Sequence, residues 1–252
     1  MEIDFTSLSP WLLVVGPLAV LAAYVVLGLS GFGSTLITVP VLAHFFPISF
    51  LVPLMVLLDL ASSLFIGGRG RRHVSTAELK VVVPFMFVGL VIGITLLVGV
   101  PDRHLRAALG VFAVAVGVHG IINPVLRDTI SRLWGIPAGI FGGVVSTLFG
   151  AGGPIYATYL SGRLRHKEEM RSTMSAIISI SAFSRAVVYA VGGLLLTKAV
   201  FLGLLVMAPF AWLGLKIGGH IHVGLTQAQM RRVVGAVLVF AGLSLLARAM
   251  LQ

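Results

Sequence analysis

Hydrophobic and polar positions in this chain occur in long blocks, with apolar runs of bilayer length separated by short polar connections. Because a helix needs about 20 apolar residues to cross a bilayer, such blocks predict membrane-spanning helices rather than a soluble core. The expected fold class is an all-α polytopic membrane protein. The predicted segments are residues 10–28, 34–46, 49–67, 80–100, 104–122, 133–149, 154–162, 172–194, 199–218 and 232–249.

The first two segments must be separated by a break. The chain carries no formal charge from Pro10 to Phe46, a stretch far longer than one crossing requires. Gly28, Gly31 and Gly33 mark the break, because glycine interrupts helices most readily. The short segments 34–46 and 154–162 are either half-helices that cross with the help of extended chain, or re-entrant hairpins.

Glycine and proline positions recur along the chain. Five pairs are separated by 125 residues, namely Pro84/Pro209, Gly89/Gly214, Gly93/Gly218, Gly110/Gly235 and Gly117/Gly242. The break itself recurs after 119 residues, where Gly31-Phe32-Gly33-Ser34 is matched by Gly150-Ala151-Gly152-Gly153. We therefore expect two five-helix transmembrane repeats, residues 1–122 and 123–252, each with a glycine-broken short helix. Two such copies are the sequence signature of a secondary transporter.

Composition narrows the class of protein further. The chain is 58% hydrophobic and 10% charged, with a mean hydropathy of +1.08, which leaves no room for a soluble catalytic or nucleotide-binding domain. The net charge of +10 lies in the predicted loops, so no nucleic-acid partner is expected. The chain has no cysteine, and no His, Asp or Glu group has metal-ligand spacing, so neither a metal nor a cofactor is expected.

Loop charges favour one topology. If all ten segments cross and the N-terminus is outside, thirteen Lys and Arg residues lie inside and four outside (Arg103, Arg106, Lys198 and Arg248). If the two short segments only dip into the bilayer, one strongly basic loop faces outward, against the positive-inside rule. Ten crossings are therefore favoured. Five crossings per repeat insert the halves in opposite orientation, which predicts an inverted repeat in the cell (plasma or inner) membrane with both termini outside.

These motifs resemble the TauE/SafE sulfite exporter family over almost the whole chain. The resemblance rests on the first break leading to Val39-Pro40-Val41, on Phe149-Gly150-Ala151-Gly152-Gly153-Pro154, and on the basic loop Arg69-Gly70-Arg71-Arg72. It implies export, or sometimes uptake, of sulfur-containing or small organic anions such as sulfite and sulfonates. Phe32 and Ser34 stand where the family often carries a small residue and a third glycine, a departure that would reshape one side of the pocket.

The two breaks are the candidate substrate site. The first N–H groups of a helix have no intrahelical partner and carry partial positive charge, so paired helix starts at mid-bilayer suit an anion. The expected binding residues are Gly31, Phe32, Gly33, Ser34, Thr35, Gly150, Ala151, Gly152, Gly153 and Pro154. The alternative is that these glycines only permit close helix packing.

Two charged residues lie inside predicted segments. Arg185 in 172–194 needs a partner or a water-lined cavity, since an arginine at the centre of a membrane helix costs about 2.5–3.5 kcal/mol. Either a substrate anion or Asp59, the only acid in the middle of a segment, can be that partner. A combined scheme is also open, in which the anion competes with Asp59 for Arg185 and Asp59 takes up a proton. Ser62 and Ser181, separated by 119 residues, either line this path or pack between helices.

The favoured function is a secondary transporter that moves a small anion by alternating access. A hydrolase needs a nucleophile with a base or paired carboxylates, and no such group lies within the predicted segments, so an enzyme is not expected. A passive anion channel and a membrane assembly factor without transport activity remain as alternatives.

Overall fold

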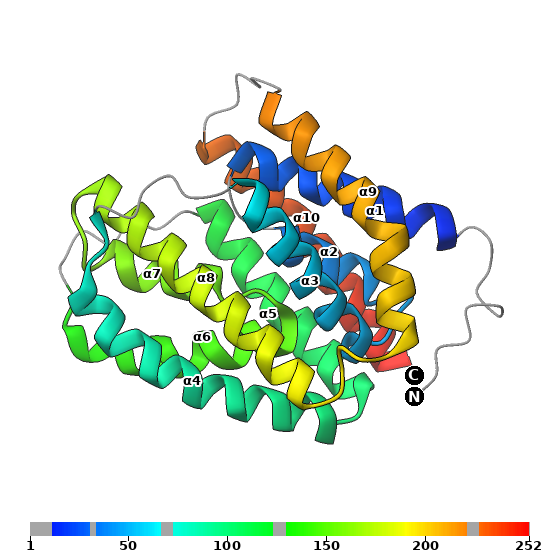
Figure 1. Ribbon diagram of the computed structural model, residues 1–252, viewed down its shortest axis with the longest axis horizontal. Coiled ribbons are helices and arrows are strands. Elements are labelled where there is room, and N and C mark those ends of the chain that lie inside the picture. The colour runs from blue at the N-terminus through cyan, green and yellow to red at the C-terminus, as the bar shows by residue number, and fades with distance from the viewer. Residues whose placement is uncertain (1–11, 31–33, 67–72, 123–129, 221–226, 252) are drawn as a thin grey trace.

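The computed structural model describes residues 12–30, 34–66, 73–122, 130–220 and 227–251 (Figure 1). These residues form ten α-helices and one 3-10 helix, so the predicted all-α class is confirmed. The helices are α1 (Leu12–Ser30), α2 (Ser34–Leu42), α3 (Ile48–Ile66), α4 (Thr76–Gly99), α5 (Asp102–Ile122), η3 (Arg132–Trp134), α6 (Gly135–Phe149), α7 (Gly153–Ser161), α8 (Lys167–Val191), α9 (Lys198–His220) and α10 (Gln227–Leu251).

Each predicted segment corresponds to one α-helix, but some boundaries differ. Helix α8 begins at Lys167, five residues before the predicted start, because Glu168 and Glu169 in its first turn are favourable at the positive end of a helix. Helix α2 ends at Leu42 rather than at residue 46. Pro47 follows shortly, and a residue before proline is disfavoured in the helical conformation.

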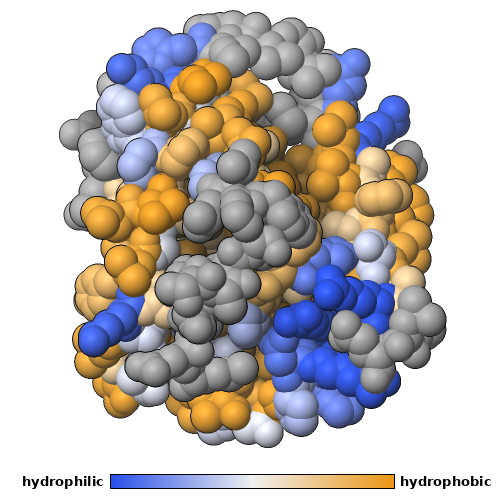
Figure 2. All heavy atoms as spheres, turned by 90° about the vertical axis from the view of Figure 1, so that its right-hand side faces the viewer, coloured by the Kyte–Doolittle hydropathy of each residue, from blue (hydrophilic) through white to orange (hydrophobic). Residues whose placement is uncertain are grey.

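The described helices have the lengths and surfaces of a membrane protein. Six of them are long and apolar enough to cross a bilayer, and α1 and α3 contain shorter apolar stretches. Many large apolar side chains are exposed, and Figure 2 shows hydrophobic residues over much of one face. Helices α2 and α7 have nine residues each. At 1.5 Å per residue, each is roughly 13 Å long, less than half of the ~30 Å hydrocarbon core.

The repeated glycines lie where helices pack most closely. The three most extensive helix pairs are α5 with α10, α4 with α6, and α1 with α9. A Cβ placed on Gly89 of α4 would lie 2.2 Å from the carbonyl oxygen of Ile140 in α6, and one on Gly214 of α9 would lie 2.4 Å from that of Leu21 in α1. Glycines 125 residues apart thus perform the same task, which is to let two backbones touch.

Contacts along α4 and α8 show that these helices run parallel, side by side in Figure 1. The N–H of Ser75, just before α4, donates to Thr173 Oγ1 near the start of α8 at 2.9 Å. At the other end, Ile94 lies against Gly192, with 3.7 Å between its Cδ1 atom and the position of a Cβ on that glycine. Residue numbers therefore increase in the same direction along both helices.

Helices α5 and α10 run antiparallel. A Cβ on Gly110 would lie 3.0 Å from the carbonyl oxygen of Gly242, and one on Gly117 would lie 2.6 Å from that of Gly235. The contacts are reciprocal, since a Cβ on Gly242 would lie 2.7 Å from Gly110 O. Gly110 and Gly235 are 125 residues apart, and so are Gly117 and Gly242. Gly110 therefore contacts the residue that matches Gly117, and Gly117 contacts the residue that matches Gly110.

These directions distinguish the two ways of counting crossings. If the chain did not return across the bilayer at α2 and α7, α4 and α8 would be antiparallel and α5 and α10 parallel. Instead, α4 and α8 are parallel, and α5 and α10 are antiparallel. The arrangement agrees with ten segments that alternate in direction.

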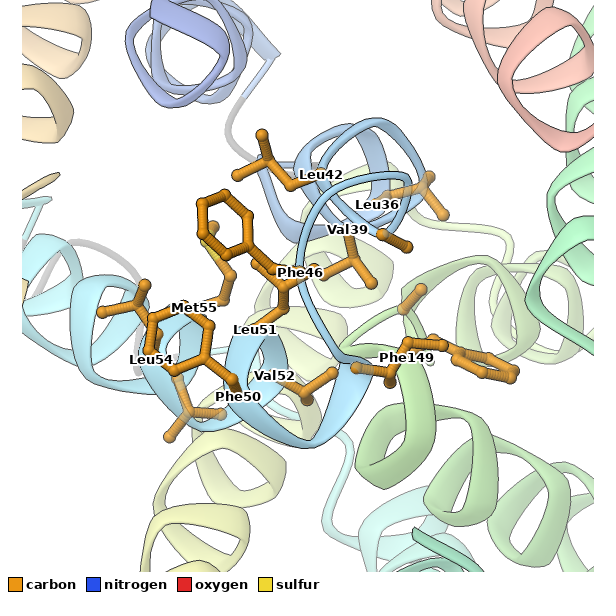
Figure 3. Close-up of a cluster of buried hydrophobic side chains, with 14 of the residues drawn as sticks. Leu36, Val39, Leu42, Phe46, Phe50, Leu51, Val52, Leu54, Met55 and Phe149 are labelled. Atoms are coloured by element: carbon orange, nitrogen blue, oxygen red, sulfur yellow. The ribbon is translucent and has the colours of Figure 1, made fainter. Parts of the chain in front are cut away.

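Helix α2 is enclosed by protein (Figure 3). Its side chains Leu36, Val39 and Leu42 belong to a buried cluster that includes Met55 of α3 and Phe149 at the end of α6. Enclosure is required, because the ends of a short helix at membrane depth expose backbone groups that lipid cannot satisfy. The cluster also brings the end of α6 against the first half of the chain.

A polar cluster around Glu78 connects α4, the segment just before α6, and α7 at one end of the molecule. The carboxylate of Glu78, 2% exposed, accepts hydrogen bonds from Arg163 Nη2 at 3.0 Å and from Arg132 Nε at 3.2 Å. Tyr159 OH also donates to Glu78. The hydrogen bond with Glu78 raises the pKa of the Arg163 guanidinium, so this arginine stays charged. The network holds the loops around residues 130 and 162 together.

Candidate functional site

Asp59, a residue of α3, lies beside the start of α2 and is held by hydroxyl groups. Its Oδ1 accepts hydrogen bonds from Tyr24 OH and Ser34 Oγ, each at 2.8 Å. Its Oδ2 accepts one from Thr35 Oγ1 at 2.5 Å. Helices α1, α2 and α3 therefore meet at this carboxylate.

The start of α2 thus faces a carboxylate of the protein itself, that of Asp59. Ser34 and Thr35 are the first two residues of α2, and their side chains donate to Asp59 rather than pointing to a separate ligand site. The carboxylate lies where a negative charge is favourable, at the positive end of a helix. Gly31, Phe32 and Gly33, also expected to bind substrate, lie outside the residues that the structure describes.

The second break lies between α6 and α7. Gly150 ends α6 in the left-handed conformation (φ 69°), and its N–H donates to Ser146 O at 2.9 Å. The same carbonyl accepts a hydrogen bond from Arg185 Nη1 at 3.0 Å. Tyr189 OH donates to Thr147 O at 2.5 Å. Side chains of α8 thus cap the last turn of α6, a role for Arg185 that the sequence did not predict.

The start of α7 offers fewer backbone donors than a typical helix start. Pro154 is in its first turn and has no N–H. The N–H groups of Ile155 and Tyr156 both donate to the carbonyl oxygen of Gly152. Gly152 also fits closely, since a Cβ there would lie 2.0 Å from Ser146 Oγ. Ala151 is buried as well. Side chains, rather than backbone N–H groups, therefore supply most of the polar character here.

Three buried donors next to this break have no hydrogen-bond partner among the residues that the structure describes. They are Arg185 Nε, Ser181 Oγ and Tyr156 OH, on residues that are 4%, 2% and 1% exposed. Tyr156 OH lies close to the side chains of Ser146 and Ser181 and within electrostatic range of Arg185. Buried polar groups are nearly always paired, so three unpaired donors in one place indicate a site for an acceptor. All three can donate to one anion.

The two breaks touch each other. A Cβ placed on Gly150 would lie 2.1 Å from Thr35 Cγ2 and 3.3 Å from Arg185 Nη1. Thr35 therefore contacts Asp59 through its hydroxyl and the second break through its methyl group. Asp59 and Arg185 lie on opposite sides of this contact, and they do not form an ion pair among those found in the described part of the chain.

The remaining predicted residues have ordinary local roles. Ser62 Oγ donates to Leu58 O at 2.7 Å, one turn back along α3, and lies near Tyr24. Gly153 has open surroundings, with only Met174 nearby at 3.8 Å from the position of a Cβ. In the described ranges, no group of three or more His, Asp or Glu side chains is placed to hold a metal ion.

Sequence reasoning missed the tyrosines. All four tyrosines of the chain, Tyr24, Tyr156, Tyr159 and Tyr189, are buried. Tyr24 lies beside Asp59, and Tyr156 and Tyr189 lie near Arg185. In membrane proteins tyrosine is usually found at the interfaces. Tyr24 and Tyr189 occur well inside apolar segments rather than at their ends. This unusual position could have identified them from the sequence as candidate functional residues.

Comparison with known proteins agrees with a transporter. A family model described as "Sulfite exporter TauE/SafE" matches residues 17–245. The chain is also similar to a protein of Comamonas testosteroni named "Probable inner membrane transporter protein TsaS". The two are 28% identical over 193 residues, which are 76% of this chain and 81% of the relative. No solved structure matches the chain.

Proposed function

The chain belongs to the TauE/SafE sulfite exporter family, whose members are membrane transporters rather than enzymes, and we propose that it carries a small sulfur-containing or organic anion by alternating access. The anion binds next to the second break, where Arg185, Ser181 and Tyr156 have buried donors near one another. Asp59 stands across the contact between the breaks, apart from these donors.

One observation carries this proposal, namely the three buried donors without partners. Nε of an arginine can only donate, and the two hydroxyl groups are free to donate as well. An unpaired buried polar group costs roughly 1–3 kcal/mol, and an anion with several oxygens would satisfy all three at once. The donors are closed off from solvent, which fits the closed state between inward-open and outward-open forms.

Replacing Ser181 by alanine should weaken anion binding about 5- to 10-fold without lowering stability, because its hydroxyl makes no hydrogen bond within the protein. The measurement is a binding isotherm on purified protein, with thermal unfolding in parallel. Ser184→Ala on the same helix is the matched control, since Ser184 Oγ already donates to Ile180 O. Equal affinities for both variants would remove Ser181 from the site.

The substrate class is drawn from the family and from the chemistry of the site. A sulfite or sulfonate group presents three oxygens, which suits three neighbouring donors. A screen of sulfite, thiosulfate, sulfoacetate, taurine and small carboxylates, read as thermal stabilisation, tests this, because a ligand that binds the folded state raises the unfolding temperature. Stabilisation by carboxylates alone would move the substrate out of the sulfur class.

We also propose that residues 1–122 and 123–252 are inverted repeats. The antiparallel, reciprocal contact of α5 with α10 supports this, because these helices are counterparts in the two halves. If each helix is replaced by its counterpart in the other half, the α1–α9 pair becomes α6–α4 and the α3–α9 pair becomes α8–α4. All four of these pairs of helices are in contact. Such a scaffold can rock about a central site and expose it to either side in turn.

The topology can be tested by cysteine labelling without interference, since the chain contains no cysteine. The positive-inside rule predicts that both termini and the loop between α8 and α9 are outside. A membrane-impermeant maleimide added to intact cells should label Leu196→Cys in that loop. It should label Arg165→Cys, in the loop between α7 and α8, only after permeabilisation. The reverse pattern would place the termini inside.

Two other functions are separated by transport measurements. A passive channel would give flux that does not saturate and would show no counterflow, whereas a carrier exchanges a labelled anion for an unlabelled one across the membrane. A membrane assembly factor would give no flux in proteoliposomes. The unpaired donors favour a carrier, because they form a binding site rather than an open path.

A further inference from the structure

We propose that Asp59 is the site of a coupling proton, so that the protein moves one proton together with each anion, and that Thr35 positions this carboxylate against the anion site. This inference rests on the proposed function. In each cycle a proton from the water on one side binds a carboxylate oxygen of Asp59, forming an O–H bond. It leaves to the water on the other side after the anion has been released.

The two halves of the protein have opposite chemistry at their breaks. At the first break, the hydroxyls of Tyr24, Ser34 and Thr35 converge on a carboxylate. At the second, Arg185 and the hydroxyls near it have donors without acceptors. The first can gain a positive charge, as a proton, and the second can gain an anion. A pair of such sites in contact can take up both without a change in net charge.

Ionisable groups of α1 and α8 lie near Asp59. From the elements packed against it, the described titratable or charged groups that face it are Tyr24 of α1 and, beyond the Thr35–Gly150 contact, Arg185 of α8. Helix α2 contributes only the hydroxyls of Ser34 and Thr35. An anion next to Arg185 would repel a negative charge on Asp59 and compensate Arg185. Proton uptake at Asp59 is therefore favoured when the anion binds.

The geometry favours a proton over a metal cation. The oxygen atoms of Tyr24, Ser34 and Thr35 lie 2.5–2.8 Å from the oxygens of Asp59, which are hydrogen-bond distances. A hard cation such as Ca²⁺ needs each oxygen roughly 2.3–2.6 Å from itself, so inserting a cation of that size would break these contacts. A proton can be accepted without moving any heavy atom, because each hydroxyl can turn from donating to accepting.

Thr35 is suited to connect the two sites. Its hydroxyl holds Oδ2 of Asp59, while its methyl group fills the space in front of Gly150, next to Arg185 Nη1. A change in the hydrogen bond to Asp59 therefore acts on a side chain that touches the second break. Coupling between sites is reciprocal, so a proton on Asp59 should strengthen anion binding by the same factor by which the anion favours the proton.

The decisive measurement compares two kinds of transport in proteoliposomes, with sulfite or the best ligand of the thermal screen as the probe. In a pH gradient of one unit, acid outside, the wild-type protein should accumulate the anion up to about tenfold, because one pH unit is a tenfold difference in proton activity. Asp59→Asn, which keeps a polar side chain of the same shape, should retain counterflow of labelled anion but lose this accumulation.

Matched variants separate coupling from structural damage. Asp102→Asn makes the same chemical change at a carboxylate elsewhere, which accepts from Ile48 N and Arg106 Nε, and should accumulate the anion like the wild type. Thr35→Val keeps the shape and removes the hydroxyl, so accumulation should fall several-fold while counterflow persists. Thr35→Ser keeps the hydroxyl and should retain more of the accumulation than the valine variant.

The outcomes distinguish this inference from the proposed function. Accumulation by Asp59→Asn equal to that of the wild type would overturn the role of Asp59. Counterflow with no response to a pH gradient, or accumulation driven by a sodium gradient instead, would overturn proton coupling and leave the anion carrier intact. Absence of both binding and counterflow in the wild-type protein for every anion tested would overturn the proposed function itself.

Discussion

Replacing Arg185 by alanine should reduce anion transport to the background of empty liposomes while the protein remains in the membrane. The guanidinium is 4% exposed, and its Nε points to no acceptor within the protein. A hydrogen bond to a charged group contributes about 1.5–3 kcal/mol, which corresponds to a loss of roughly 10- to 100-fold in anion affinity from this one contact. Loss of the compensating charge at membrane depth adds to that effect.

Arg185 has a second role, and the controls must separate the two. Its Nη1 caps the carbonyl of Ser146 at the end of α6, so the alanine variant should also unfold at a lower temperature. Arg185→Lys keeps the charge but lacks the Nε donor, and should recover part of the binding. Arg171→Ala removes an exposed arginine from the same helix and should transport normally. Anion flux for Arg185→Ala equal to that for Arg171→Ala would remove Arg185 from the mechanism.

The helices and the second break could be predicted because their causes are local. Apolar runs specify the ten segments, and glycine marks the interruption before α7, where Gly150 adopts a left-handed conformation. The repeat of glycines was also informative, since positions such as Gly89 and Gly214 serve the same close packing of α4 on α6 and of α9 on α1. Counting loop charges predicted ten segments that alternate in direction, and the directions of α4 with α8 and of α5 with α10 agree with that count.

The pairing of polar groups could not be predicted, because it depends on which side chains meet across distant helices. Asp59 and Arg185 were candidates for a direct ion pair, yet Thr35 and Gly150 lie between them and each charged group has other contacts. The backbone donors expected at the start of α7 are reduced by Pro154 and by hydrogen bonds to Gly152 O. Tyr156 supplies a donor instead, through a fold that brings α7 against α8.

Replacing Gly150 by alanine should strongly impair both stability and transport, because two independent effects act at this position. The residue has φ 69°, and the left-handed conformation costs an L-amino acid about 1–2 kcal/mol. The new methyl group would also lie 2.1 Å from Thr35 Cγ2, so the contact between the two breaks would have to open. Thermal unfolding and anion flux of the purified variant measure the two consequences.

The chain offers a matched control for the first effect. Gly193 has φ 72° and nothing within 4 Å of the position of its Cβ, so Gly193→Ala has the backbone strain without the clash. The additional loss in Gly150→Ala then reports the contact with Thr35. Because Thr35→Ser removes the clashing methyl group, the double variant Gly150→Ala/Thr35→Ser should recover much of that additional loss, as a double-mutant cycle would show. If Gly150→Ala behaves like Gly193→Ala, or if serine at position 35 gives no recovery, the two halves do not meet at Thr35 and Gly150, and the coupling of Asp59 to the anion site loses its physical connection.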